Sequence, residues 1–227
     1  MVKNTYVIIP AYNEEKNISK AVRNTKKYSQ NIIVVDDGSQ DRTKEFAIQN
    51  NVIVLRHEKN AGKGVALKTG CEFALKKGAQ ILVLIDADNQ HDPSLIPKFV
   101  DTIRNKKVNI VFGTRKLGGQ MPVVYRFGNW FLNKIIAILC GINLRDTQCG
   151  FRAFTSQAYK KIRWQSKRYA AESEVVALVR KHKLRYAELE IPTIYHDKFK
   201  GTTPLDGIRI LFSIVKWKIF RRRKTKR

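Results

Sequence analysis

Two aspartates one residue apart, Asp86 and Asp88, are the side chains of this sequence best suited to chemistry. They directly follow the segment 81–85, the most hydrophobic run of the chain. In an extended segment residues i and i+2 point to the same side, so these two carboxylates could hold one divalent cation together. Oxygen ligands of this kind suit Mg²⁺ or Mn²⁺. A strand-end turn, which aspartate also favours, is the alternative that the triplet alone leaves open.

The elements that must position this pair follow from the hydrophobic pattern. We expect strands over residues 6–9, 31–35, 52–55, 81–85 and 109–113, and helices over 14–28, 42–50 and 62–77 and from Pro93 onward. Asn13 is the expected N-cap of the first helix, and Asp92 precedes the proline that opens the last. Alternating strands and helices predict an α/β fold with a mostly parallel sheet flanked by helices on both faces. Ligands of such sheets bind at the carboxyl ends of the strands, where residues 10–14, 36–37 and 86–88 all fall.

The bulk composition points to an anionic partner. The formal net charge is +25 and the sequence pI is about 10.2, which suits nucleic acid, a membrane surface or a phosphorylated substrate. Nucleic acid is not expected, because acidic residues at successive strand ends would repel phosphates without a metal. The segment 60–64, Asn-Ala-Gly-Lys-Gly, lacks the spacing of a P-loop, although its glycines could open a helix or admit a ligand. The three widely spaced cysteines form no disulfide or zinc pattern, which favours a reducing, cytosolic-facing location.

Several motifs occur in order along the chain: residues 9–14 (IPAYNE), 35–39 (VDDGS), 41–43 (DRT), 62–64 (GKG), 86–93 (DADNQHDP), 113–115 (GTR) and 146–152 (DTQCGFR). This ordered set resembles the inverting GT-A-fold glycosyltransferases of family 2. Within that family it is similar to the polyprenyl-phosphate (dolichyl-phosphate) mannosyl- and glucosyltransferases, over residues 5–203. The resemblance implies a GT-A fold, in which a mostly parallel central sheet is flanked by helices.

The resemblance also implies a role for each matching residue. Nucleotide-sugar binding falls to Pro10, Tyr12, Glu14, Val35, Asp36, Asp37, Lys63, Asp86, Ala87, Asp88, Arg115 and Lys198. The metal, Mg²⁺ or Mn²⁺, falls to Asp86, Asp88 and Gln90, and the acceptor phosphate to Arg115, Arg126 and Lys200. Asp88, Arg115 and Lys198 are the expected catalytic residues. For Arg115 the alternative is a surface charge, but its place at the end of a strand favours the site.

Some positions depart from the family pattern or stay open. Lys198 stands where the family commonly has an arginine, and Pro204 where it has a lysine. A lysine offers a point charge, not a bidentate fork, although Lys200 could compensate. Asp146 and Arg152 suit a structural role as well as the site. The pair Glu172 and Glu174 could supply a base if the acceptor were a sugar hydroxyl, but an exposed helix face is the favoured interpretation.

The implied reaction is metal-dependent inverting transfer of a hexose, from GDP-mannose or UDP-glucose, to a polyprenyl or dolichyl phosphate at the cytosolic membrane face. One alternative is the same fold acting on a glycan or another hydroxyl acceptor. A different class of alternative is a non-catalytic protein that binds a nucleotide sugar or nucleic acid.

The C-terminal segment suggests how the chain reaches a membrane. Residues 1–204 form the expected GT-A domain, and 205–227 a basic amphipathic helix and tail, in which eight of the last twelve residues are basic. Such a helix is typical of peripheral membrane attachment; a helix packed on the domain with a solvated tail is the alternative. No run reaches the roughly 20 apolar residues of a membrane span, and a separate membrane-protein partner is left open.

Overall fold

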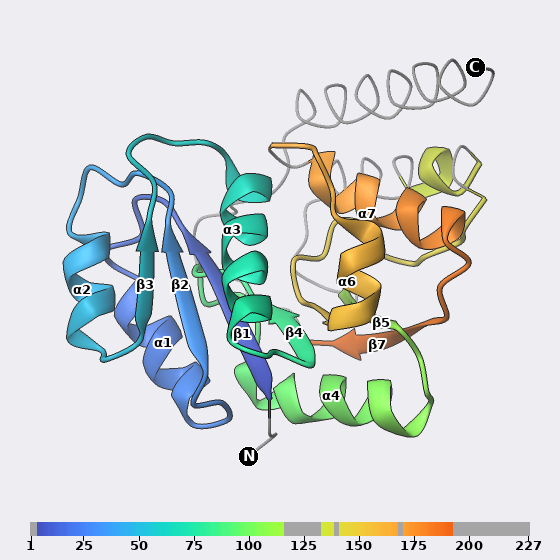
Figure 1. The fold of residues 1–227 in the computed structure, drawn as a ribbon, viewed down its shortest axis with the longest axis horizontal. Coiled ribbons are helices and arrows are strands. Elements are labelled where there is room, and N and C mark those ends of the chain that lie inside the picture. Colours follow the sequence, from blue (N-terminus) through green and yellow to red (C-terminus); the bar gives the residue numbers. More distant parts are fainter. Residues whose placement is uncertain (1–3, 116–132, 139–140, 168–169, 193–227) are drawn as a thin grey trace.

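The structure, a computed structural model, describes residues 4–115, 133–138, 141–167 and 170–192 (Figure 1). Its first half contains β1 (Thr5–Ala11), α1 (Ile18–Lys26), β2 (Ile32–Asp36), α2 (Thr43–Gln49), β3 (Ile53–Arg56), α3 (Lys63–Lys76) and β4 (Ile81–Leu84). Its second half contains the 3₁₀ helix η1 (Pro93–Leu95), α4 (Ile96–Asn105), β5 (Ile110–Arg115), β6 (Arg152–Thr155), α6 (Ser156–Ile162), α7 (Ala170–Lys181) and β7 (Tyr186–Ile191). The expected alternation of strands and helices is confirmed.

These strands form one sheet in the order β3-β2-β1-β4-β6-β5-β7. Strand β6 runs antiparallel to both of its neighbours, β4 and β5, while every other pairing is parallel. The mainly parallel sheet is therefore confirmed, with one reversed strand that the sequence did not predict. Since β1, β2, β4 and β5 all run the same way, their carboxyl ends share one edge. The loop that precedes β6 reaches that same edge, because β6 starts where its neighbours end.

Helices cover both faces of the sheet, as expected (Figure 1). Strand β1 shows how side chains divide between the two cores: Ile8 packs with residues of α3, α6 and α7, whereas Val7 and Ile9 pack with residues of α1 and α4. This follows from the alternation of side chains along a strand. On the second face Phe99 of α4 stacks on Phe151, with ring centroids 4.2 Å apart. That contact holds the loop before β6 against α4.

The predicted start of the first helix is wrong. Helix α1 begins at Ile18 with Asn17 at its N-cap, not at residue 14 with Asn13 as the cap. Asn13 has a left-handed φ of 53°, and its side chain accepts a hydrogen bond from the backbone N–H of Gln40. The segment 12–15 is therefore a loop that binds the loop after β2. By contrast, the expected helical start at Pro93 is confirmed, and Asp92 is its N-cap, because the Asp92 carboxylate accepts from the N–H of Ser94.

Candidate active site

Asp86 lies just beyond β4, beside the ammonium group of Lys63 and the imidazole of His91. Oδ1 is 2.8 Å from Nζ of Lys63, and Oδ2 is 3.9 Å from Nε2 of His91. A Cβ added to Gly150 would lie only 2.3 Å from Oδ2, so this glycine allows the carboxylate to fit. Burial alone would raise the pKa of Asp86, but Lys63, His91 and Arg115 together more than offset it, and the pKa is lowered. Asp86 is thus a carboxylate anion kept charged by its neighbours.

The pKa of Asp88 is shifted in the opposite direction to that of Asp86. Burial, followed by the negative charge of Asp86, raises its pKa to about 6. Its Oδ1 accepts from the backbone N–H of Gln90 at 3.0 Å. Within the described part of the chain, no basic side chain forms an ion pair with it at 4 Å or less. A cation at this point would relieve the repulsion between the two carboxylates.

The donor set fits a hard divalent metal, with an incomplete set of protein ligands. Asp86 and Asp88 offer carboxylate oxygens, the ligand type that Mg²⁺ and Mn²⁺ prefer. Across the described residues, however, no group of three or more His, Cys, Asp or Glu side chains could hold a metal ion. The remaining ligands would have to come from Gln90, water or a bound diphosphate. Mg²⁺ commonly binds in this way, through one or two carboxylates and substrate phosphates.

Lys63 joins Asp86 to a second acid, Glu172 of α7. The distance from Nζ to Glu172 Oε1 is 3.4 Å, and the Glu172 side chain is only 6% exposed. The favoured interpretation of Glu172 and Glu174 as an exposed helix face is therefore wrong, since both are buried. The carboxylate of Glu174 accepts from the N–H groups of Gln165 and Ser166. Glu174 thus fixes a loop, while Glu172 contacts the site.

Arg115 ends β5 and points to the same region. Its Nε and Nη2 donate to the two carboxylate oxygens of Asp146, at 2.6 and 3.0 Å. Although burial would raise the pKa of Asp146, Arg115 outweighs burial and the pKa is lowered. Asp146 thus has the structural role considered for it, because it holds the side chain of Arg115, an expected site residue. Arg115 is also close enough to Asp86 to help lower the pKa of that carboxyl.

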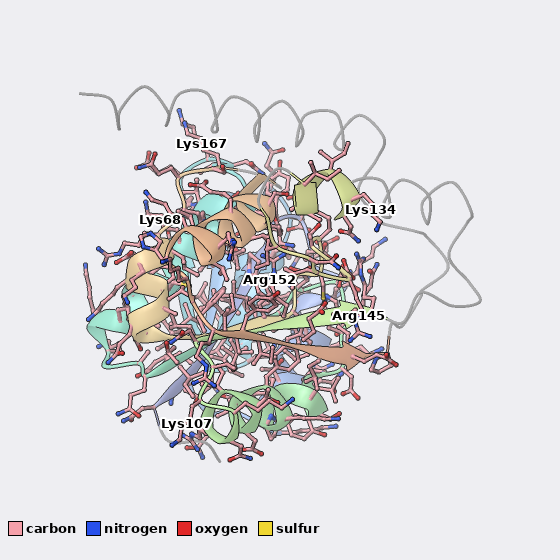
Figure 2. All side chains as sticks on the ribbon, turned by 90° about the vertical axis from the view of Figure 1, so that its right-hand side faces the viewer. Lys68, Lys107, Lys134, Arg145, Arg152 and Lys167 are labelled. Atoms are coloured by element: carbon pink, nitrogen blue, oxygen red, sulfur yellow. The ribbon has the colours of Figure 1, made fainter. Side chains whose placement is uncertain are left out.

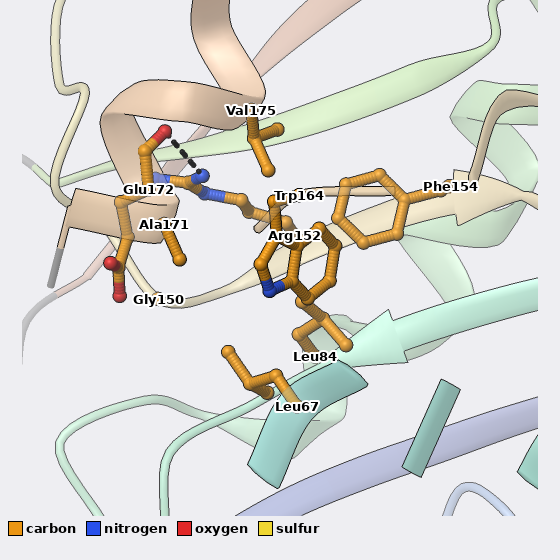
Figure 3. Close-up of a pocket in the computed structure, with 9 residues that line it drawn as sticks. All are labelled: Leu67, Leu84, Gly150, Arg152, Phe154, Trp164, Ala171, Glu172 and Val175. Atoms are coloured by element: carbon orange, nitrogen blue, oxygen red, sulfur yellow. Dashed lines mark hydrogen bonds between the residues drawn. The ribbon is translucent and has the colours of Figure 1, made fainter. Parts of the chain in front are cut away.

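Arg152 is a structural residue. Its side chain is buried, whereas lysines such as Lys107 and Lys134 lie toward the outside of the molecule in Figure 2. Its guanidinium donates to the backbone carbonyls of residues 147, 149 and 172. Figure 3 shows it beside a small cavity of about 10 Å³, with Trp164 and Phe154 in the wall. That volume is about the space of one water molecule, which is too small for a substrate.

The aspartates after β2 are turned inward. Asp36 accepts from Ser39 N–H and lies 3.5 Å from Nε of Arg56. Asp37 is 2.6 Å from Nδ1 of His57 and accepts from the N–H groups of residues 61 and 62. Both carboxylates are almost completely buried. In this structure they order the loops around the expected nucleotide site, including the one that leads to Lys63.

The other expected nucleotide-binding residues are divided between the surface and the interior. Tyr12 is 43% exposed, and Glu14 accepts a hydrogen bond from the side chain of Asn17. Pro10, Val35 and Ala87 are buried at or near strand ends. Arg126, Lys198, Lys200 and the segment 205–227 lie outside the described residues. Sequence reasoning missed His91 and Gly150 as neighbours of Asp86, although both lie inside quoted motifs.

Fold and site together define an α/β enzyme of the sugar-nucleotide transferase type, and the chain belongs to glycosyl transferase family 2, whose family model matches residues 6–163. The fold is GT-A-like. The structure is similar to that of glucosyl-3-phosphoglycerate synthase from Mycobacterium tuberculosis in complex with Mn²⁺, uridine diphosphate and phosphoglyceric acid. That match has a TM-score of 0.73 and 20% identity, and covers 93% of this chain and 78% of the other.

Two curated relatives are similar over nearly the whole chain. The UDP-N-acetylglucosamine–dolichyl-phosphate N-acetylglucosaminyltransferase of Methanococcus voltae is 38% identical, over 96% of this chain and 97% of that protein. The polyprenol monophosphomannose synthase of Mycolicibacterium smegmatis is 26% identical, over 96% of this chain and 88% of that protein. The chain is thus a family 2 glycosyltransferase whose relatives include polyprenyl-phosphate sugar transferases.

Proposed function

We propose that this enzyme transfers a sugar from a nucleoside-diphosphate sugar to a polyprenyl phosphate, with inversion at the anomeric carbon. The observation that carries the proposal is the meeting of Asp86 and Asp88 with the cations Lys63 and Arg115 at one sheet edge. An acid pair suited to a metal, beside two basic groups, matches the needs of two phosphorylated substrates. The names of the relatives support the acceptor class.

In this mechanism Asp86 and Asp88, with Gln90, would hold Mg²⁺ or Mn²⁺. When bound, the metal neutralises the charge of the diphosphate leaving group. An oxygen of the acceptor phosphate attacks the anomeric carbon as the bond from that carbon to the diphosphate oxygen breaks. A phosphate monoester has a second pKa near 6 and is largely dianionic at neutral pH, so the attack needs no general base. Arg115, oriented by Asp146, provides positive charge between the two anions.

The nature of the sugar is the finer part of the proposal. The sequence pattern suggested a hexose carried by GDP-mannose or UDP-glucose. The name of the Methanococcus voltae relative adds UDP-N-acetylglucosamine, and its higher identity makes a UDP-linked sugar the donor that we propose.

A donor screen tests this proposal directly. UDP-N-acetylglucosamine, UDP-glucose and GDP-mannose are each incubated with the full-length protein, polyprenyl phosphate and Mg²⁺ or Mn²⁺, and the lipid product is detected by mass spectrometry. We expect one UDP-sugar to give polyprenyl-phosphate sugar, and Asp88→Asn to lower the rate by at least about 100-fold. The matched control is Asp101→Asn, an exposed aspartate of α4. Transfer to sugar hydroxyls alone would refute the acceptor, and full activity of the Asp88 variant would refute the metal assignment.

We also propose that residues 205–227 attach the enzyme to the cytosolic side of a membrane surface, where the enzyme would reach its lipid acceptor. Among the described helices, none is long and apolar enough to cross a bilayer. The support is the basic, amphipathic sequence of the segment. Liposomes that contain anionic lipid should sediment the full chain in a salt-sensitive manner and retain far less of a chain that ends at residue 204. Equal sedimentation of both chains would reject this attachment.

A further inference from the structure

Lys63 lies between two carboxylates, and one oxygen beside it has no partner. Its Nζ is 2.8 Å from Asp86 Oδ1 and 3.4 Å from Glu172 Oε1. Glu172 Oε2 is buried and accepts no hydrogen bond in the described structure. A buried carboxylate oxygen without a donor is costly, so its presence calls for an explanation. The ammonium group of Lys63 thus has an unused acceptor on a carboxylate that it already approaches.

The backbone next to Lys63 is fixed, so a change of partner would involve the side chain alone. The N–H of Gly64 donates to the carbonyl of Lys167 at 2.9 Å, and the carbonyl of Gly64 accepts from Trp164 Nε1 at 2.8 Å. A Cβ on Gly64 would lie 2.5 Å from the carbonyl oxygen of Ser166. The start of α3 is therefore locked against the loop 164–167.

The same loop is tied to α7, which carries Glu172. The carboxylate of Glu174 accepts from the N–H of Gln165 and, at 2.8 Å, from the N–H of Ser166. In Figure 3 the carboxylate of Glu172 lies on the Gly150 side, away from the guanidinium of Arg152. Glu172 is consequently held at a set distance from the start of α3.

Lys63 and a metal would share Asp86. The ammonium of Lys63 lies 2.8 Å from Oδ1, and Oδ2 lies close to Gly150, where an added Cβ would be 2.3 Å away. A divalent cation bound to Asp86 and Asp88 would lie beside this ammonium group, and repulsion between the two positive charges would make the cation compete with Lys63 for Asp86. Any ammonium group displaced from Asp86 needs another anion, because a buried unpaired charge is strongly unfavourable. Glu172 is the nearest carboxylate with capacity to receive it.

We propose that Lys63 is a mobile counter-cation of the metal site. It neutralises Asp86 while no metal is bound, and its ammonium group moves to Glu172, including Oε2, when a divalent cation binds Asp86 and Asp88. Glu172 is then a positioning residue that acts through Lys63. This inference rests on the proposed function, because that function places the metal at Asp86 and Asp88.

The test measures binding of Mn²⁺ alone to the full-length protein, by the electron paramagnetic resonance signal of free Mn²⁺. We expect Lys63→Met to tighten binding by about tenfold, because the competing charge is gone. Glu172→Gln should weaken binding by a similar factor, because Lys63 loses its second partner. In the double variant the effect of Glu172→Gln should disappear, to within about twofold. The control is Lys68→Met on the same helix, with unchanged binding.

Independent effects of the two substitutions would overturn the inference, because two fixed charges would add without coupling. If the wild-type protein binds no Mn²⁺, with or without uridine diphosphate, the metal assignment of the proposed function fails as well, and the two failures are thereby distinguished. A crystal structure of the wild type with Mn²⁺ and uridine diphosphate tests the inference without any variant. We expect Lys63 Nζ at Glu172 Oε2, and a lysine still bonded to Asp86 would refute the exchange.

Discussion

The ion pair of Arg115 and Asp146 makes a prediction whose size follows from its geometry. Asp146 has a side chain only 4% exposed and accepts from Arg115 Nε, Nη2 and backbone N–H, and from Gln148 N–H. In Asp146→Asn the amide nitrogen would replace one oxygen. If it replaces Oδ2, it faces two donors of Arg115, and the charge of the arginine loses its partner.

Removing one member of a buried ion pair typically costs about 3–5 kcal/mol. Arg115 keeps 18% of its side chain exposed, so water can satisfy part of the guanidinium. We therefore expect a loss of about 2–3 kcal/mol in the free energy of unfolding. For a domain of this size that corresponds to a fall in Tm of about 5–10 °C. The control is Arg163→Gln, which removes the half-exposed pair of Arg163 and Glu72 and should cost less than about 1 kcal/mol.

Calorimetry or circular dichroism between pH 3 and pH 8 completes this test. The folded-state pKa of Asp146 is lowered, so its stabilising contribution is fully present above the unfolded pKa of about 3.9 and is lost as the pH falls through the folded pKa. The difference in stability between wild type and Asp146→Asn should therefore be constant from about pH 5 to pH 8 and shrink below about pH 4. A difference that is absent at pH 7, or that does not shrink in acid, would refute the buried pair.

Three further predictions concern the surroundings of the site. Gly150→Ala places a Cβ against Asp86 Oδ2, so it should lower the rate of sugar transfer by about tenfold or more and should also weaken Mn²⁺ binding. Normal metal binding by this variant would contradict the close fit of Asp86 against Gly150. Trp164→Phe removes the side-chain donor of the buried carbonyl of Gly64 and should lower the free energy of unfolding by about 0.5–1.5 kcal/mol, measured by urea denaturation; an unchanged midpoint would show that this bond adds no stability. Burial raises the pKa of the Cys149 thiol to about 12 and the pKa of the Cys71 thiol well above its usual value. In a Cys140→Ser variant, therefore, neither thiol should react with a disulfide reagent at pH 8 until the protein is unfolded. Prompt labelling of the native protein would show that these thiols are accessible.

The gathering of the expected site residues at one edge of the sheet could be predicted from the sequence, because it depends on simple geometry. Strands of a parallel sheet end at one edge, so residues 10–14, 36–37 and 86–88 and Arg115 had to lie near one another. The structure places them there. The same rule could not reveal that β6 is reversed, since the direction of a strand depends on the path of the chain before it. It also gave no orientation for Asp36 and Asp37, whose carboxylates turn inward.

The start of α1 was mispredicted for a local reason. The run Asn-Glu-Glu at residues 13–15 has the composition of a helix N-terminus. Its backbone groups, however, find partners in the loop after β2: Asn13 N–H donates to Ser39 Oγ, and Glu14 N–H to Thr43 Oγ1. These bonds join positions distant in sequence, which a local pattern cannot anticipate. Ser39 and Thr43 therefore explain, in structural terms, part of the motif that the chain shares with its family.

The acids of α7 were mispredicted because burial depends on partners elsewhere in the chain. A glutamate on a helix is usually exposed, and nothing near Glu172 in the sequence indicates otherwise. It is buried because Lys63, on another helix, supplies the opposite charge. Glu174 is buried because a loop supplies backbone N–H groups. Such pairs are recognised only once the fold has brought α3 and α7 together.

The net charge of the chain does not describe the site. Among the described residues, the carboxylates of Asp88, Glu172 and Asp146 lie near Asp86, and the basic groups near them are Lys63, Arg115 and Arg152. The pKa of His91 is lowered to about 4, mainly by burial, so this imidazole is neutral at physiological pH. Carboxylates therefore outnumber cations in this group, despite a chain charge of +25. Under the proposed function, a divalent cation that enters with the diphosphate or before it would offset this negative charge. We therefore expect the positive surface to serve the approach of anionic partners, and a metal at Asp86 and Asp88 to allow the donor to bind there.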